Sequence, residues 1–134
     1  MTEVFFPNFL TIAEVLEIHK NQIDLYGGSH GVKDQALLES ALAQPEATFG
    51  GKFLHTDIIE MASAYCYHLI ENHAFNDGNK RVGIVTALVF LTMNDFELNV
   101  SEDELEKFVL GVAARNVLKP DVVKYFRKYS QVHF

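Results

Sequence analysis

The sequence predicts an all-α protein, a compact bundle of about six helices in which a polar loop joins two central helices. Three observations predict this class. Apolar residues recur with the period of a helix through most of the chain, strand-like alternation is absent, and helix-capping or turn residues separate the periodic segments. The 134 residues, 49% of them hydrophobic, suit one core, so we expect residues 1–134 to form a single domain.

The first two helices are expected before residue 44. Thr11 and Glu14 have the spacing of a capping box, which predicts a helix start near Thr11, and Gly27-Gly28 predicts its end. The expected buried face of this helix is Ile12, Val15, Leu16, His19 and Ile23. A second helix is predicted over residues 33–43. Its expected inward residues are Leu37, Leu38, Ala41 and Leu42.

The longest irregular stretch is residues 44–56, in which Gly50-Gly51 favours a turn or a flap. A third helix is predicted over residues 57–72, and Asp57 and Glu60 are candidates to cap its start. Its apolar stripe consists of Ile58, Met61, Ala62, Tyr65, Cys66, Leu69 and Ile70. Because Cys66 lies in this stripe and is the only cysteine, we expect it to be buried, and no internal disulfide can form.

Three further helices are predicted after the polar loop. The fourth begins near Gly78 and continues to about Met93; it is apolar on nearly all sides, so we expect it at the centre of the bundle. It is too short to span a bilayer. Ser101 and Glu104 have capping spacing and open a fifth helix, which is expected to reach about residue 115. A sixth opens at residues 119–121, where Pro120 takes a permitted first-turn position.

The charge and the composition exclude some classes of partner. The net charge of −7 argues against a broad nucleic-acid surface, which needs a basic face, so we expect no direct nucleic-acid partner. The first residues lack the basic and apolar regions of a secretory signal, and no segment predicts a membrane partner. Together with the single cysteine, these features predict a protein of the reducing cytoplasm.

Residues 73–81, His-Ala-Phe-Asn-Asp-Gly-Asn-Lys-Arg, combine the groups that phosphate chemistry needs. The backbone amides of Gly78, Asn79 and Lys80 would be the unpaired donors of a helix N-terminus, which attracts anions. Lys80 and Arg81 add positive charge, and an arginine can hold two phosphate oxygens at once. The segment therefore predicts a site for a phosphate group.

The same segment also offers acid–base and metal-binding groups. Asp77 has a carboxylate suited to Mg²⁺ bound together with substrate phosphates, and His73 is a candidate general base. Phe75 is expected to enter the core and fix the loop. Each group alone has an ordinary structural explanation; their combination before a buried helix indicates a functional site. The remaining histidines are expected to be packed or solvated: His19, His30, His55, His68 and His133.

The segment His73-x-Phe75-x-Asp77-Gly78-Asn79-Lys80-Arg81 matches the signature of the Fic/Doc family, and the sequence resembles the death-on-curing (Doc-type) toxins of that family. The resemblance extends along most of the chain, through Tyr26-Gly27-Gly28, Gly31-Val32, residues 37–42, Pro45, Phe49-Gly50-Gly51 and residues 87–94. It implies an all-α bundle built around the two helices that flank the motif. It also implies that residues 44–56 correspond to a target-docking flap.

The resemblance implies a role for each motif residue. His73 would take a proton from a hydroxyl of a target protein, Asp77 would hold Mg²⁺, and Phe75 would be structural. The phosphates of the nucleotide, expected to be ATP, would be bound by Gly78, Asn79, Lys80 and Arg81.

Two positions separate the branches of the family. Enzymes that transfer AMP have glycine at the position of Lys80 and a second arginine at the position of Ile84. Lys80 and Ile84 resemble the Doc branch instead. This resemblance implies transfer of a phosphate to a threonine of elongation factor Tu and arrest of translation. Two alternatives remain: a Fic-type protein adenylyltransferase, and an inactive member that serves as a binding module.

The resemblance also implies a partner. Many Fic enzymes carry an inhibitory Ser/Thr-x-x-x-Glu-Gly/Asn helix, but the nearest segment here, beginning at Thr56, has Met61 at its last position. Inhibition is therefore expected from a separate antitoxin, as in a toxin–antitoxin module, with an antitoxin helix bound in an apolar groove.

Overall fold

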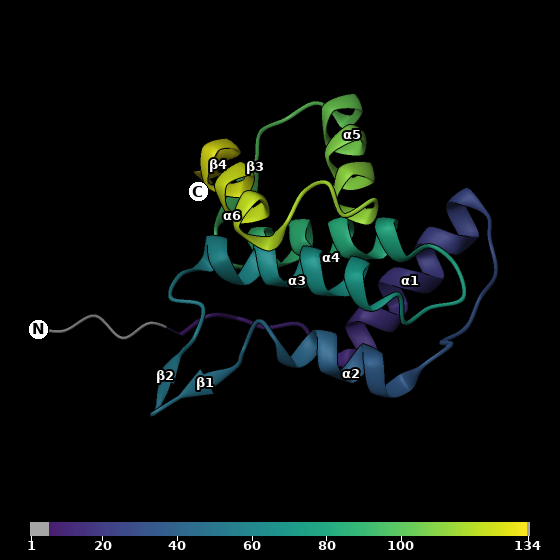
Figure 1. Cartoon of the computed structure of the whole chain (residues 1–134), viewed down its shortest axis with the longest axis horizontal. Coiled ribbons are helices and arrows are strands. Elements are labelled where there is room, and N and C mark those ends of the chain that lie inside the picture. The colour runs from purple at the N-terminus through teal and green to yellow at the C-terminus, as the bar shows by residue number, and fades with distance from the viewer. Residues whose placement is uncertain (1–5, 134) are drawn as a thin grey trace, which may run out of the picture.

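The computed structural model describes residues 6–133 and confirms the all-α class (Figure 1). The described helices are α1 (Ile12–Tyr26), α2 (Gln35–Ala43), α3 (Ile58–Asn72), α4 (Asn79–Met93), α5 (Glu102–Ala113) and α6 (Lys119–Tyr129). Two small antiparallel sheets accompany them. One pairs β1 (Thr48–Phe49) with β2 (Lys52–Phe53), and the other pairs β3 (Phe96–Leu98) with β4 (Ser130–Val132).

The strands are a difference from the sequence prediction, which contained none. Each is only two or three residues long, too short for a period of two to be recognised. The first pair is closed by Gly50 and Gly51, both at positive φ, so the predicted turn is confirmed. The second pair joins Phe96 to Val132 across the chain, a contact that local sequence does not encode.

Side-chain caps begin most helices where the sequence predicts. Thr11 and Glu14 form the reciprocal capping box of α1, and Asp57 and Ser101 accept backbone hydrogen bonds at the starts of α3 and α5. Helix α2 begins later than the predicted residue 33. The N–H groups of residues 33 and 34 donate to the carbonyl of Ala74 instead, so these residues are held away from the helix.

Helices α3 and α4 form the centre of the bundle, with α5 and α6 on one side and α1 and α2 on the other (Figure 1). Gly83 allows α3 and α4 to approach closely, since a Cβ there would lie 2.7 Å from a side-chain carbon of Ile70. The loop after α3 therefore starts and ends on two well-packed helices.

The core contains every residue of the predicted α3 stripe. Cys66 is buried as predicted, and burial raises the pKa of its thiol to about 12. The prediction is wrong for two residues: the side chains of Leu16 on α1 and Leu37 on α2 are exposed, because each lies at the edge of the apolar face of its helix. Within residues 6–133, no helix combines the length and the apolar character that crossing a bilayer requires.

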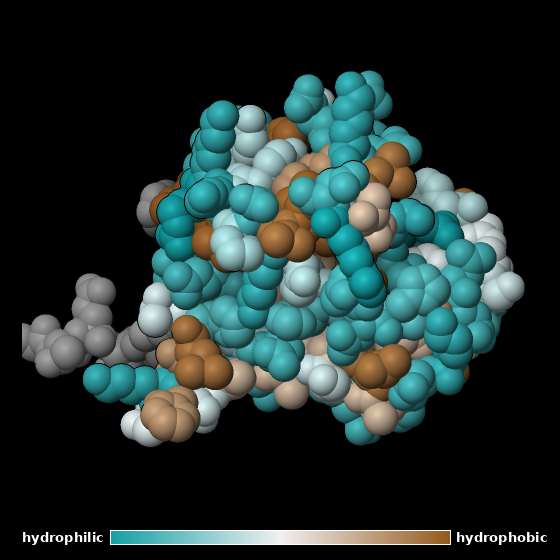
Figure 2. Space-filling model, in the orientation of Figure 1, coloured by the Kyte–Doolittle hydropathy of each residue, from teal (hydrophilic) through white to brown (hydrophobic). Residues whose placement is uncertain are grey.

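The β1–β2 hairpin lies far from the loop that carries the motif. It precedes the first residue of α3, whereas His73 follows the last, and the 15 residues between correspond to about 22 Å of helix. The hairpin therefore lies at the end of α3 opposite to the motif, and its expected role as a target-docking flap stays a prediction. Hydrophobic atoms are visible over the hairpin in Figure 2, where Phe49 and Leu54 are exposed.

Residues 31–34 occupy the place beside the motif instead. Val32 forms a β-bridge with Phe75, and the N–H of Asn76 donates to the carbonyl of Gly31. This short segment between α1 and α2 forms an edge of the candidate site.

Candidate active site between helices α3 and α4

The loop between α3 and α4 is bounded by two residues in the left-handed region. His73 has φ 51° and ends α3; Gly78 has φ 77° and precedes α4. Glycine adopts this conformation without strain, and histidine is one of the residues enriched there. The two reversals turn the chain from one central helix into the next and leave His73 exposed at the surface.

Asn79 holds the loop together from inside. Its side chain is buried, its Oδ1 accepts from the N–H of Phe75 at 3.0 Å, and its Nδ2 donates to the carbonyl of Phe75 at 3.0 Å. Phe75 is itself buried, as expected of an anchor. In this structure the side-chain amide of Asn79 is therefore bound to the backbone of the loop.

His19 supports the same loop from α1. It is buried, its ring stacks on Phe75 with 4.0 Å between centroids, and its Nε2 donates to the carbonyl of Asp77 at 2.9 Å. The sequence by itself predicts only a packed or solvated histidine at this position. The one sequence feature that indicates support of the loop by His19 is the presence of a polar residue on the otherwise apolar face of α1.

The carboxylate of Asp77 is exposed and held by backbone donors. Its two oxygens accept from the N–H of Ser29 at 3.2 Å and of Gly78 at 2.9 Å. These bonds lower the pKa of Asp77, and the nearby charges of Arg81 and Lys80 lower it further. Gly28 is needed for this arrangement, because a Cβ there would lie 2.6 Å from the Asp77 carboxylate.

An ionised, exposed carboxylate fits Mg²⁺ that arrives with a nucleotide. Magnesium in nucleotide sites is bound by one or two carboxylates together with substrate phosphates and waters. Within the part of the chain that the structure describes, no three histidine, cysteine or acidic residues cluster as a metal site.

The amino end of α4 presents unpaired backbone donors. Gly78 provides no side-chain cap, and the N–H groups of Asn79, Lys80 and Arg81 have no hydrogen-bond acceptor within residues 6–133. The N–H of Gly78, by contrast, is bound to Asp77. The unpaired donors at this helix end are therefore the amides of residues 79–81, the kind of group that attracts anions.

The two cations of the motif differ in their contacts. Arg81 donates from Nη1 to the carbonyl of Gln22 at 3.1 Å and from Nη2 to that of Gly27 at 2.9 Å, so its guanidinium ties α4 to the end of α1. Lys80 is exposed and makes no ion pair among the described residues.

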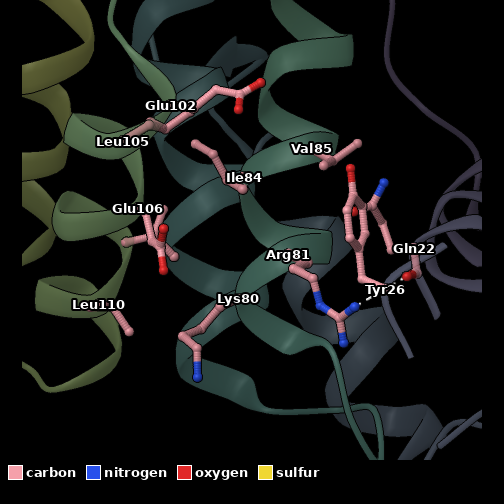
Figure 3. A pocket seen from close by; sticks show the side chains of 11 residues that line it. Gln22, Tyr26, Lys80, Arg81, Ile84, Val85, Glu102, Leu105, Glu106 and Leu110 are labelled. Atoms are coloured by element: carbon pink, nitrogen blue, oxygen red, sulfur yellow. Dashed lines mark hydrogen bonds between the residues drawn. The ribbon is translucent and has the colours of Figure 1, made fainter. Parts of the chain in front are cut away.

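Two adjoining cavities meet at Lys80 and Arg81. The polar one, about 370 Å³, is lined mainly by the motif: Ile70, His73, residues 76–81 and Ala113. The other, about 580 Å³, is a mostly apolar groove between α1, α4 and α5 (Figure 3). Ile84 and Val85 of α4 face it, Leu105 and Leu110 line it from α5, and Arg81 extends toward Gln22 and Tyr26 of α1.

Lys33 also lies at the candidate site, although no motif in the sequence includes it. Its Nζ lies 3.0 Å from Nδ1 of His73, although 40 residues separate the two in sequence. No local pattern could have identified this lysine, because its position depends on residues 31–34 lying beside the loop.

A loop that carries a histidine, a carboxylate and two cations between two central helices defines a class of protein. Residues 9–91 match the Fic/DOC family, and this match covers more than half of the chain. The protein therefore belongs to the Fic/DOC family.

Within that family the chain is similar to death-on-curing toxins. It is 28% identical over 115 residues to the protein named Protein kinase doc of Escherichia phage P1, an alignment that covers 86% of this chain and 90% of the relative. It is 37% identical over 93 residues to Toxin Doc of Mycolicibacterium smegmatis, covering 68% of this chain and 72% of that protein. The names of these two relatives support the function of a toxin. The family match and the name Protein kinase doc support the activity of a transferase.

Proposed function

We propose that this protein is a toxin that transfers a phosphate from Mg-ATP to a serine or threonine hydroxyl of a target protein. The family's target, elongation factor Tu, is the proposed substrate, and its phosphorylation would block translation. One observation carries the proposal. The polar cavity is lined by an exposed histidine, an ionised carboxylate and the unpaired amides that open α4.

In the proposed reaction the target hydroxyl oxygen forms a bond to the γ-phosphorus of ATP, and the bond to the β-phosphate oxygen breaks to release ADP. The hydroxyl proton passes to His73, which is exposed at the cavity. The amides of residues 79–81 and Lys80 hold the phosphates. Asp77 holds the Mg²⁺ that accompanies the nucleotide, which neutralises phosphate charge.

Two residues favour phosphate transfer over AMP transfer. Lys80 adds bulk and charge at the entrance to α4, where a glycine would let a phosphate approach the backbone closely. Ile84, one turn further along α4, faces the apolar groove and offers no charge to a distant phosphate. The name Protein kinase doc, printed for the phage relative, agrees with this choice.

The proposal is tested with ATP labelled separately at the α and γ phosphates. Purified protein is incubated with elongation factor Tu and each ATP, and the target is analysed by autoradiography and mass spectrometry. We expect γ label on the target and no α label. Transfer of α label would instead establish the adenylyltransferase alternative. If Mg-ATP does not bind in calorimetry, the inactive binding module is correct.

We also propose that a separate antitoxin is the partner of this protein, and that its helix binds in the groove between α1, α4 and α5. The groove is mostly apolar, as an amphipathic helix requires, and adjoins the polar cavity at Lys80 and Arg81. A helix bound there would lie next to the phosphate site.

The groove is tested by growth rescue with the antitoxin that a short upstream reading frame is expected to encode. We expect Val85→Glu to abolish rescue while leaving toxicity, because a charge would enter the apolar surface. Leu54→Glu, on the exposed hairpin, is the matched control and should be rescued normally. Normal rescue of Val85→Glu would place the antitoxin elsewhere.

A further inference from the structure

Lys33 is held beside the motif by the backbone around it. Its own N–H donates to the carbonyl of Ala74 at 2.8 Å, as does that of Asp34 at 3.0 Å, and the bridge between Val32 and Phe75 extends the pairing. The backbone position of Lys33 is therefore fixed relative to His73. Its side chain is exposed, and among residues 6–133 its Nζ makes no ion pair and has one hydrogen-bond partner, Nδ1 of His73.

The contact uses the single lone pair that a neutral imidazole offers. A lysine ammonium has three donors and no acceptor, so Lys33 donates and Nδ1 of His73 accepts at 3.0 Å. Nε2 then carries the ring proton, because a neutral imidazole has one N–H and one lone pair. In this arrangement His73 has no lone pair left for a proton from a substrate, whichever nitrogen faces the cavity.

Protonation of His73 is incompatible with Lys33 in its present place. An imidazolium has two N–H donors, so the Lys33 ammonium would lose its acceptor and face a second positive charge 3.0 Å away. The lysine must therefore move before the histidine can act as a base. Its flexible four-carbon stem allows this movement without any change in the backbone.

We propose that Lys33 is a positioning residue that blocks His73 until nucleotide phosphates enter the polar cavity. A phosphate beside His73 offers the ammonium a stronger, charged acceptor than an imidazole nitrogen. Lys33 then transfers its hydrogen bond to the phosphate, and the lone pair of His73 is released for the target hydroxyl. This inference rests on the proposed function, since it takes the bound anion to be the nucleotide that the enzyme uses.

The tautomer of His73 provides a direct test. Long-range ¹H–¹⁵N NMR of the full chain labelled with ¹⁵N-histidine distinguishes protonated from unprotonated ring nitrogens. Without nucleotide we expect only the Nε2–H tautomer; Mg²⁺ with a non-hydrolysable ATP analogue should convert a large part of His73 to the Nδ1–H form. Lys33→Met should give a mixture of both tautomers before nucleotide is added. Lys124→Met, an exposed lysine change on α6, should behave like the wild type.

Two NMR outcomes would overturn the inference. One is a wild-type His73 that stays Nε2–H when saturated with the analogue. The other is a Lys33→Met variant that keeps the wild-type tautomer. Failure of the proposed function is distinguishable, because calorimetry would then show no nucleotide binding while the tautomer of the nucleotide-free protein still reports the contact.

Kinetics separates this role from a merely structural one. For Lys33→Met we expect the KM for ATP to rise about tenfold or more, because a phosphate contact is lost, while kcat stays within about threefold of wild type. Lys33→Arg keeps a cation and should restore much of the KM. Equal losses of kcat in both variants, with KM unchanged, would contradict the proposal.

Discussion

Lysine and histidine side chains meet at two places around helix α3, and the two places differ in what surrounds them. Beyond the end of α3, Lys33 meets His73 at the edge of the polar cavity, where both side chains are exposed. At the other contact, Lys119 of α6 lies 2.9 Å from Nε2 of both His55 and His68, and all three side chains are partly buried. The same pair of residue types therefore occurs in an open site and in a closed one.

Burial decides the chemistry of the closed contact. Burial, together with the positive charge of Lys119, lowers the pKa of His68 to about 4, and burial also lowers the pKa of His55 and of Lys119. Both imidazoles are therefore neutral at pH 7, and their nitrogens accept from the ammonium. Neither of the two cavities described above includes these residues. The closed contact joins α6 to α3, whereas the open one faces a space that a substrate can enter.

The largest expected difference between the two contacts is in activity. His73→Asn should reduce phosphate transfer by about 10²–10⁴-fold, because it removes the proposed base. Asparagine tolerates the left-handed backbone of residue 73, so the variant should keep its stability, which alanine there would not preserve as well. Single-turnover transfer of the γ label measures the loss.

His68→Ala is the counterpart of that change at the closed contact. It removes one acceptor of Lys119 and leaves the cavity unaltered, so activity should stay near wild type while stability falls by about 1 kcal/mol. Chemical denaturation measures the second quantity. A catalytic loss in His68→Ala as large as that in His73→Asn would remove the distinction between the contacts.

Asn79→Ala should have the next largest effect, a loss of stability. It removes the hydrogen bonds to Phe75 that hold the loop next to the open contact between Lys33 and His73. The change leaves the buried N–H and carbonyl of Phe75 without partners, which should cost about 1–3 kcal/mol of unfolding free energy. Asn72→Ala is the matched control, since it breaks a single exposed bond to Leu37, and should cost less. An equal loss of unfolding free energy in the two variants would show that the two hydrogen bonds between Asn79 and the backbone of Phe75 do not hold the loop.

Local sequence was sufficient for the helices and for most of the motif. The capping spacing at Thr11 and the apolar stripe of α3 depend only on neighbours within a few residues, so both were predicted correctly. The motif was recognisable for the same reason, since its groups lie within nine consecutive residues. The exposed Leu16 marks the limit of this reasoning, because periodicity does not tell how wide a face the neighbouring helices cover.

Contacts between distant segments could not be predicted in this way. His19 reaches Asp77 across 58 residues, and Lys119 reaches His55 across 64. Which lysine meets which histidine depends on how α2 and α6 pack, and this information is not present in any single segment. The same holds for Arg81, whose guanidinium donates to two carbonyls near the end of α1, contacts that the motif alone does not indicate.

The smallest expected effect concerns the pH dependence of stability at the closed contact. A histidine whose folded pKa lies below its unfolded value near 6.5 contributes stability that is fully present above pH 6.5 and lost as the pH falls toward the folded pKa. For His68 this window extends from about 6.5 down to about 4, and His55 acts in the same direction. Asp77 titrates below this window, because its pKa is lowered from 3.8.

We therefore expect the unfolding free energy to fall by about 1–2 kcal/mol between pH 6.5 and pH 4.5, a value reduced for the partial exposure of these side chains. Denaturation curves across that range measure it. The double variant His55→Ala/His68→Ala should flatten the dependence, whereas His133→Ala, an exposed histidine beside Glu97, should leave it unchanged. Lys119→Met should retain most of the slope, because burial lowers the pKa of His68 more than Lys119 does. A slope abolished by Lys119→Met alone would mean that charge repulsion, and not burial, distinguishes the closed contact from the open one.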